Sequence, residues 1–325
     1  MTSAVRTALV TGVAGQDGVL LARHLRGLGR RVVGTVRPGA GEFAAMRCYL
    51  DGVVGVDLDV RDTDGFAAVL ADVRPDEVYN LAGFSSVGAS WDQPDLVMEV
   101  NGAAVERMLS AIVAHQAATG REVRFFQASS AEELGSAAGS PYARSKARAR
   151  AAVVDARERH GLFACAATLF NHESPLRAPR FVTRKITRAA AEIALGRRSS
   201  LALGNLAVTR DWGAAREYVA AMAAMLALDE PADLTLATGV PHTLEDLLVC
   251  AFDAAGLGDP WSYVSQDPAL VRPADSDVLV GDPEPAAEVL GWRATVSFQE
   301  LVAEMVAVDL RRVESGVEED AAYLG

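Results

Sequence analysis

The sequence has few of the residues that build metal sites or disulfides. Its three cysteines, Cys48, Cys165 and Cys250, are far apart and form no CxxC pair, and its five histidines are scattered. This spacing offers no zinc-ligand pattern, and an odd set of isolated cysteines is typical of free thiols in a reducing cytoplasm. We therefore expect a cytoplasmic protein with no metal ion.

Long hydrophobic runs and an excess of positive charge are also missing. No apolar run reaches membrane-spanning length, and the start, MTSAVRTALV, lacks the apolar core of a signal peptide. The formal net charge of −12 argues against nucleic acid and against an anionic membrane surface as partners. What is present is a chain of 325 residues, 50% of them hydrophobic, which can bury a large core.

The first half of the chain alternates short apolar runs with helical patterns. Strands are predicted at residues 5–11, 31–36, 53–56 and 123–128, and a further strand, the fourth in order, ends at residues 80–83 within DEVYNLAG. This alternation predicts an α/β fold, a Rossmann-type doubly wound parallel sheet. In such sheets, ligands bind at the carboxyl ends of the strands.

A glycine-rich turn follows the first predicted strand. GVAGQDG places Gly12, Gly15 and Gly18 in GxxGxxG spacing, and the helical pattern VLLARHLRGLG comes next. Strand, glycine turn and helix are the context in which a backbone approaches the pyrophosphate of a dinucleotide. The stretch predicts a dinucleotide cofactor, and an ordinary strand-to-helix turn is the alternative.

The ends of the next strands favour NADP over NAD. An NAD enzyme usually has an acid after the second strand, whereas this chain has Arg37, which can pair with a 2′-phosphate. A solvated surface arginine is the alternative. Asp59 and Val60 follow the third strand, where residues often contact adenine. Leu81 and Ala82 lie at the end of the fourth, where small residues let the chain pass close to the cofactor.

The candidate catalytic residues lie in SSAEELGSAAGSPYARSK, directly after the fifth strand. Tyr142 and Lys146 are four residues apart, so they share one face of a helix predicted over residues 142–160. A lysine ammonium beside a phenol favours the phenolate, which can serve as a base for a sugar hydroxyl. Ser130 adds a hydroxyl for a carbonyl or alkoxide. Glu132 adds a second base, or is merely a surface glutamate.

The second half of the chain shows shorter, interrupted patterns. We predict a division into residues 1–170, a dinucleotide-binding Rossmann domain with the catalytic residues, and 171–325, mainly a substrate-binding cap interleaved with it. The acidic tail, 314–325, is predicted to fray. Residues 177–198 are mainly basic although the chain as a whole is acidic. This predicts that they bind an anionic ligand such as a diphosphate, and the alternative is a helix surface that faces solvent or another subunit. The basic residues of this segment are Arg177, Arg180, Arg184, Lys185, Arg188, Arg197 and Arg198.

Nearly the whole chain resembles the extended short-chain dehydrogenase/reductase family and, within it, the GDP-mannose 4,6-dehydratases. The shared phrases are LVTGVAGQDG, VYNLAG, FFQASS, LFNHESP, FVTRKITRAAAEIALG, LGNLAVTRDWG and RPADSD. The glycine spacing and YxxxK indicate only the superfamily. NHESP, FVTRKI and GNL…RDWG are more specific and indicate the branch that acts on GDP-sugars.

The resemblance implies a role for each matching residue. The catalytic residues are Ser130, Glu132, Tyr142 and Lys146. The contacts to NADP are Gly12, Gly15, Gln16, Asp17, Gly18, Arg37, Asp59, Val60, Leu81, Ala82, Tyr142 and Lys146. The contacts to a GDP-sugar are Ser85, Asn171, Val182, Lys185, Asn205, Arg210 and Arg272. The resemblance also implies a homo-oligomer, for which a homodimer is expected and a tetramer is the alternative.

The implied activity is dehydration of a GDP-sugar by transient oxidation, proton removal by Glu132 and return of hydride. Departures from the family pattern leave alternatives open. The link from Glu132 to Tyr142 is short, and Ala131 and Leu134 stand where the family usually has a serine and a tyrosine. Arg37 is followed by a proline and a glycine instead of a second arginine and a polar loop. The alternatives are dehydration or epimerisation of a longer-chain GDP-sugar, a GDP-4-keto-sugar reductase, and a catalytically silent NADP-binding protein.

Overall fold

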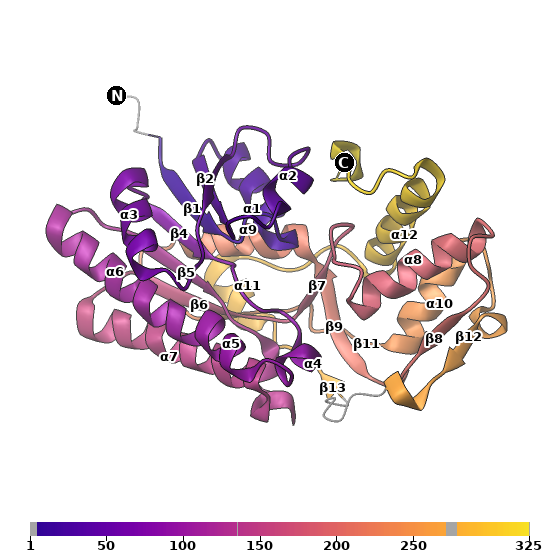
Figure 1. The fold of residues 1–325 in the computed structure, drawn as a ribbon. Coiled ribbons are helices and arrows are strands. Elements are labelled where there is room, and N and C mark those ends of the chain that lie inside the picture. Colours follow the sequence, from indigo (N-terminus) through magenta and orange to yellow (C-terminus); the bar gives the residue numbers. More distant parts are fainter. Residues whose placement is uncertain (1–4, 135, 271–277, 325) are drawn as a thin grey trace.

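The computed structural model describes residues 5–134, 136–270 and 278–324, and a seven-stranded parallel sheet forms its larger part. The strand order is β10-β6-β5-β4-β1-β2-β3 (Figure 1). The strands are β1 (Thr7–Thr11), β2 (Arg31–Val36), β3 (Val54–Asp57), β4 (Glu77–Asn80), β5 (Arg124–Ala128), β6 (Ala164–Leu169) and β10 (Leu234–Leu236). The predicted doubly wound sheet is confirmed, and the strands predicted in the first half fall on β1 to β5.

Helices cover both faces of this sheet. On one face lie α1 (Gln16–Gly27), α9 (Ala215–Met225) and α11 (Glu284–Leu290), and on the other α3 (Thr63–Val73), α6 (Ala104–Thr119) and α7 (Pro141–His160). Ala8 and Val10 of β1 pack into the first layer and Leu9 into the second. A strand covered on both faces must be apolar throughout, which explains the continuous run TALVT.

The cap packs around a third hydrophobic cluster, beside the carboxyl edge of the sheet (Figure 1). Its elements are α8 (Val182–Ala194), β8 (Leu201–Leu203), α10 (Leu244–Ala254), β12 (Val264–Gln266) and α12 (Phe298–Ser315). A small sheet joins the cap to the main sheet and contains β7 (Asn171–Glu173), β9 (Thr209–Ala214), β11 (Pro241–Thr243) and β13 (Val278–Leu279). Because β10 and α9 return to the main sheet, the two halves of the sequence interleave. The division at residue 170 stays a prediction.

The C-terminal tail, residues 316–324, is ordered, so the prediction that it frays is wrong. Tyr323 is buried, and its hydroxyl donates to the Val317 carbonyl at 2.8 Å. The Tyr49 hydroxyl, from the first half of the chain, donates to Glu319 Oε2 at 2.9 Å. Glu319 also pairs with Arg312 of α12 at 3.2 Å. The acidic side chains that suggested a solvated tail are therefore the groups that dock it.

Across the described ranges, we find no helix that combines the length and the apolar character needed to cross a membrane.

Candidate active site

Strand β5 and helix α7 bring the predicted catalytic residues together at the carboxyl edge of the sheet. Ser130 follows β5 and begins a 3-10 turn (Ala131–Glu133) by accepting the Glu132 N–H at 3.3 Å. Ser140 caps α7 in the same way, accepting the Ala143 N–H at 3.1 Å. This cap sets Tyr142 in the first turn of α7, where it hydrogen-bonds to Ser130.

Burial dominates the ionisation of the Tyr142–Lys146 pair. Burial raises the pKa of Tyr142 to about 12, against the opposing effects of the Ser130 hydrogen bond and the charge of Arg177. Lys146 Nζ donates to the Ala128 carbonyl at 2.9 Å and lies 5.8 Å from the Tyr142 ring centroid. Burial lowers the pKa of Lys146 to about 8. Burial therefore opposes a Tyr142 phenolate at neutral pH in the protein alone, and the role of Lys146 in forming it stays a prediction.

The two adjacent glutamates have different surroundings. Glu133 is buried to 2% side-chain exposure and pairs with Arg150 at 3.0 Å. It also accepts the Ser129 hydroxyl, which ties it to the end of β5. Glu132 is half-buried, and the charges of both glutamates act to raise the pKa of Tyr142, that of Glu132 more strongly. Glu133 holds the turn through its contacts, and the role of Glu132 as a second base stays a prediction.

The turn between β1 and α1 has the shape of a pyrophosphate cradle. Gly12 has a φ of +69°, and a Cβ there would lie 2.9 Å from the backbone of Ala82 and 3.2 Å from that of Leu81. A Cβ on Gly18 would lie 2.4 Å from the Gly12 carbonyl oxygen. Gly15 is the N-cap of α1 and offers no capping side chain, so the first N–H groups of the helix remain for an anion. These residues fit a dinucleotide.

Gln16 and Asp17, also predicted to contact the cofactor, are held by the NHESP segment. Asp17 Oδ2 lies 2.9 Å from His172 Nε2, and Gln16 Nε2 donates to the His172 carbonyl at 3.0 Å. The Ser174 hydroxyl donates to Gln16 Oε1 at 2.9 Å. Although burial alone lowers the pKa of His172, the charge and hydrogen bond of Asp17 raise it above its usual value. His172 was missed from the sequence, where NHESP served only to indicate a family.

Arg177 brings positive charge to the catalytic end of the site. Its Nε lies 3.1 Å from Glu173 Oε2, which also accepts the Thr183 hydroxyl at 2.9 Å. Its guanidinium carbon lies 3.7 Å from the centroid of the Phe181 ring. Its charge acts to lower the pKa of Tyr142. The sequence placed Arg177 only in a basic run, because its carboxylate partner and the phenol come from other elements.

The predicted adenine end is occupied by ion pairs. Arg37 Nη2 donates to Glu42 Oε1 at 2.7 Å, and both side chains are exposed. Arg61 binds both oxygens of Asp59, at 2.9 and 2.6 Å, and these hydrogen bonds lower the pKa of Asp59 to about 2. Val60 packs into the core. An exposed pair contributes at most about 1 kcal/mol, so Arg37 can exchange Glu42 for a phosphate.

The predicted substrate residues lie in elements of both the main sheet region and the cap. They are Ser85 after β4, Asn171 in β7, Val182 and Lys185 in α8, Asn205 after β8 and Arg210 in β9, while Arg272 lies outside the described residues. Lys185 Nζ donates to the Ala202 carbonyl at 2.8 Å. Arg210 is buried, and its Nη1 donates to the Thr209 carbonyl at 2.9 Å. Asn205 Oδ1 accepts the Ala207 N–H at 2.9 Å. Their roles in binding a nucleotide-sugar stay predictions.

The loop that carries Ser85 is held by a residue that the sequence did not single out. Asn101 lies in a π-helical turn (Glu99–Ala103) ahead of α6. Its Nδ2 donates to the Phe84 carbonyl at 2.9 Å, and its Oδ1 accepts the Phe84 N–H at 2.8 Å. A Cβ on Gly83 would lie 2.9 Å from Asn101 Oδ1 and 3.8 Å from Lys146 Nζ. This close packing links the Ser85 loop to the catalytic helix. No spacing pattern in the sequence predicts this contact.

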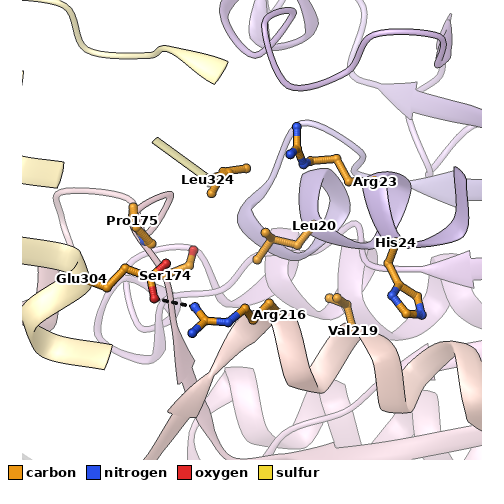
Figure 2. A pocket seen from close by; sticks show the side chains of 9 residues that line it. All are labelled: Leu20, Arg23, His24, Ser174, Pro175, Arg216, Val219, Glu304 and Leu324. Carbon is orange, nitrogen blue, oxygen red and sulfur yellow. Dashed lines mark hydrogen bonds and ion pairs between the residues drawn. The ribbon is translucent and has the colours of Figure 1, made fainter. Parts of the chain in front are cut away.

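A cavity of about 180 Å³ lies elsewhere, between α1, α9, α12 and the tail. Figure 2 shows side chains from these elements around it, including Leu20, Val219 and Leu324. Arg216 and Glu304 form an ion pair at its wall. None of its lining residues is a predicted site residue. Within the described part of the chain, no cluster of three or more His, Cys, Asp or Glu side chains could hold a metal ion.

Comparisons with known proteins identify the family. A family model described as GDP-mannose 4,6 dehydratase matches residues 9–305. GDP-mannose 4,6 dehydratase 2 of Arabidopsis thaliana is 40% identical over 342 residues, covering 98% of this chain and 91% of that protein. GDP-mannose 4,6-dehydratase of Sinorhizobium fredii (strain HH103) is 37% identical over 346 residues, with 94% and 97% covered.

A solved structure of more distant sequence shares the fold. UDP-glucose 4-epimerase of Thermus thermophilus, in complex with NAD, superposes with a TM-score of 0.78 at 26% identity and covers 94% of this chain and 99% of that one. The family model spans most of the chain, and the relatives align over nearly its whole length. On this evidence, the chain belongs to the GDP-mannose 4,6 dehydratase family.

Proposed function

We propose that this protein dehydrates a GDP-sugar, with GDP-mannose as the substrate and NADP as the cofactor. The observation that carries the proposal is the presence of two separate candidate bases, one just after β5 and one at the start of α7, in a member of this family. Tyr142 can act on a hydroxyl, and Glu132 lies near enough to influence its pKa. A simple reductase needs the tyrosine and the lysine, whereas a dehydratase also needs a base for a carbon-bound proton.

The residues present fit an NADP molecule. The cradle of Gly12, Gly15 and Gly18 suits the pyrophosphate, and Arg37 can exchange its exposed partner Glu42 for the 2′-phosphate. When bound, NADP⁺ would supply a reversible hydride acceptor, and the positive charge of its ring would favour the Tyr142 phenolate. Lys146 is placed by its hydrogen bond to Ala128 and would bond the nicotinamide ribose.

The chain's own residues divide the proton transfers. Tyr142, as phenolate, accepts the proton of the C4 hydroxyl while Ser130 donates a hydrogen bond to the ketone oxygen that forms. The ketone acidifies the neighbouring C5 proton, which Glu132 removes. Water then leaves from C6, with a carboxylic acid or a bound water protonating the departing hydroxyl. The hydride taken from C4 returns to C6 and C5 takes back a proton. The two protons accepted by Tyr142 and Glu132 balance those given to the departing hydroxyl and to C5, so the net change is the loss of one water.

The diphosphate is proposed to lie at the start of α8. This helix begins at Val182 with no side-chain cap, so its first N–H groups can donate to phosphate oxygens. Lys185 and Arg210 add positive charge on this side, and Asn171 opens β7 beside it. We also propose that the protein acts as a homodimer in the cytoplasm, where its free thiols would stay reduced.

The test is incubation of the purified protein with GDP-mannose and catalytic NADP⁺, without reductant, followed by mass spectrometry. Loss of one water with no net NADPH would establish dehydration. Consumption of added NADPH by a GDP-4-keto-sugar, with no dehydration, would indicate a reductase instead. No change, from protein shown to bind NADP⁺, would reject GDP-mannose and direct the search to longer-chain GDP-sugars.

A further inference from the structure

Arg180 reaches from the segment before α8 to the loop after β4. Its Nη2 donates to the Ser85 hydroxyl at 3.2 Å, so two segments that are far apart in the sequence meet at this point. Its guanidinium carbon lies 4.9 Å from the centroid of the Phe181 ring. Among the described residues, Arg180 forms no ion pair with a carboxylate. Most of its N–H groups are therefore not committed to another group in the described ranges.

The other basic residues near α8 are engaged differently. Arg177 pairs with Glu173 at 3.1 Å, and Arg184 pairs with Asp309 at 2.7 Å. Arg188 pairs with Glu318 at 2.7 Å. These arginines support the fold or the catalytic end. Arg180 differs from them because its guanidinium lies against the hydroxyl of Ser85, a predicted substrate residue.

The sequence that links Glu133 to Tyr142 is poor in charged donors. Between Glu133 and Tyr142 the sequence LGSAAGSP contains no charged side chain. The Ser140 hydroxyl at the end of this stretch is used as the cap of α7. A hexose presented to Tyr142 still carries hydroxyl groups at C2 and C3, which do not react and need partners once they leave water. Ser85 and Arg180 are a polar pair near the catalytic helix, because a Cβ on Gly83, two residues before Ser85, would lie 3.8 Å from Lys146 Nζ.

We propose that Arg180 is a specificity-determining residue that grips the non-reacting hydroxyl groups of the sugar together with Ser85. A guanidinium presents five N–H donors in one plane, which suits adjacent hydroxyl groups as well as an anion. The sugar is the target because Arg180 lies against the neutral Ser85, while Lys185 and Arg210 serve the diphosphate. This inference rests on the proposed function, since it assumes a GDP-hexose in the site.

The experiment compares Arg180→Gln with Arg197→Gln, an exposed arginine of the same basic segment that contacts no predicted site residue. Binding of GDP and of GDP-mannose is measured by calorimetry in the presence of NADP⁺, together with KM and kcat. Loss of hydrogen bonds from a charged donor predicts that Arg180→Gln raises Kd and KM for GDP-mannose about tenfold or more. We expect its affinity for GDP to stay within about twofold and kcat within about threefold.

Two results would overturn the inference. An equal loss of affinity for GDP and GDP-mannose would make Arg180 a phosphate contact, and no loss for either would make it a surface arginine. Arg180→Lys keeps the charge but not the planar fork, so its affinity for GDP-mannose should lie between wild type and Arg180→Gln. Wild-type protein that neither binds nor converts GDP-mannose would reject the proposed function itself. Normal wild-type turnover with an unchanged Arg180→Gln variant would reject only the role of Arg180.

Discussion

Two buried clusters of charged side chains lie near the start of α8, and they differ in what they face. The first, the site cluster, borders the glycine turn and Tyr142 and consists of Asp17, His172, Glu173 and Arg177. The second, the tail cluster, joins α8, α12 and the tail and consists of Arg184, Asp309, Arg312 and Glu319. Both clusters place opposite charges at hydrogen-bond distance. Only the site cluster lies next to predicted cofactor-binding and catalytic residues.

The tail cluster is closed on itself. Arg184 Nε lies 2.7 Å from Asp309 Oδ1, and the Thr187 hydroxyl donates to Asp309 Oδ2 at 2.8 Å. Arg184 Nη1 also donates to the carbonyls of Pro175 and Arg177, at 2.9 and 3.0 Å. Because these hydrogen-bonding groups already have partners within the protein, the charges hold the elements together and are poorly suited to bind a ligand. In the site cluster, by contrast, Arg177 still influences the pKa of Tyr142. What a buried charge faces therefore matters more than its being buried.

The adjacent glutamates Glu132 and Glu133 give the largest expected contrast between a site residue and a structural one. Glu132→Gln should lower kcat for dehydration about a thousandfold, because it removes the base for C5. Its free energy of unfolding should stay within about 0.5 kcal/mol of wild type. Glu133→Gln should cost about 1 kcal/mol or more of stability through its contacts with Ser129 and Arg150, with turnover largely kept. Mass spectrometry measures turnover and urea unfolding measures stability. If Glu133→Gln lost turnover while Glu132→Gln kept it, the assignment of the two glutamates would be reversed.

Asp309→Asn tests the tail cluster. It leaves Arg184 and Arg312 buried beside a neutral amide, and breaking a buried ion pair costs about 3 kcal/mol or more. Glu318→Gln is the matched control, because it breaks the exposed pair with Arg188 and should cost less than about 1 kcal/mol. Urea unfolding compares the two variants. Equal losses of stability in the two variants would show that the buried ion pairs of Asp309 stabilise the fold no more than an exposed pair does.

Local sequence signals predicted the part of the molecule built from short-range patterns. Continuous apolar runs predicted β1 and β2, and the spacing of Tyr142 and Lys146 predicted one face of α7. The glycine spacing predicted a turn whose Gly12 and Gly18 positions have no room for a Cβ. These features depend on backbone conformation and periodicity within about 20 residues, which a single sequence displays.

Long-range pairing is what the sequence did not display. Tyr49 and Glu319 meet across 270 positions, so the acidic tail looked solvated. Asp17 and His172 meet across 155 positions, so His172 looked like one scattered histidine among five. The basic run near α8 predicted an anionic ligand, but Arg184 and Arg188 are paired with carboxylates from distant segments. Charge composition indicated the region but not the partner of each side chain.

The pH dependence of stability distinguishes the site cluster more finely. Burial lowers the pKa of His172, but the charge and hydrogen bond of Asp17 together raise it by more. The pKa in the folded protein therefore lies above the unfolded value near 6.5. Protonated His172 therefore adds stability that is complete below the unfolded pKa and is lost as pH rises through the folded pKa. His172→Gln should therefore cost more stability at pH 6 than at pH 8. Urea unfolding at both pH values measures this, and a cost independent of pH would contradict a charged His172.

The smallest expected effect concerns the link between the tail and the first half of the chain. Tyr49→Phe removes the hydroxyl that donates to Glu319 and accepts the Asp320 N–H at 3.2 Å, which should cost about 1 kcal/mol. Tyr323→Phe is its control, because that hydroxyl bonds only Val317 within the tail region. If the Tyr49 hydroxyl joins the tail to the first half of the chain, Tyr49→Phe should accelerate hydrogen exchange at two places. These are residues 317–324 and the backbone around Tyr49. In Tyr323→Phe, exchange around Tyr49 should stay slow, since the bond between the halves remains. Acceleration at both places in both variants would mean that the tail detaches as a unit and that the Tyr49 hydroxyl is one contact among many.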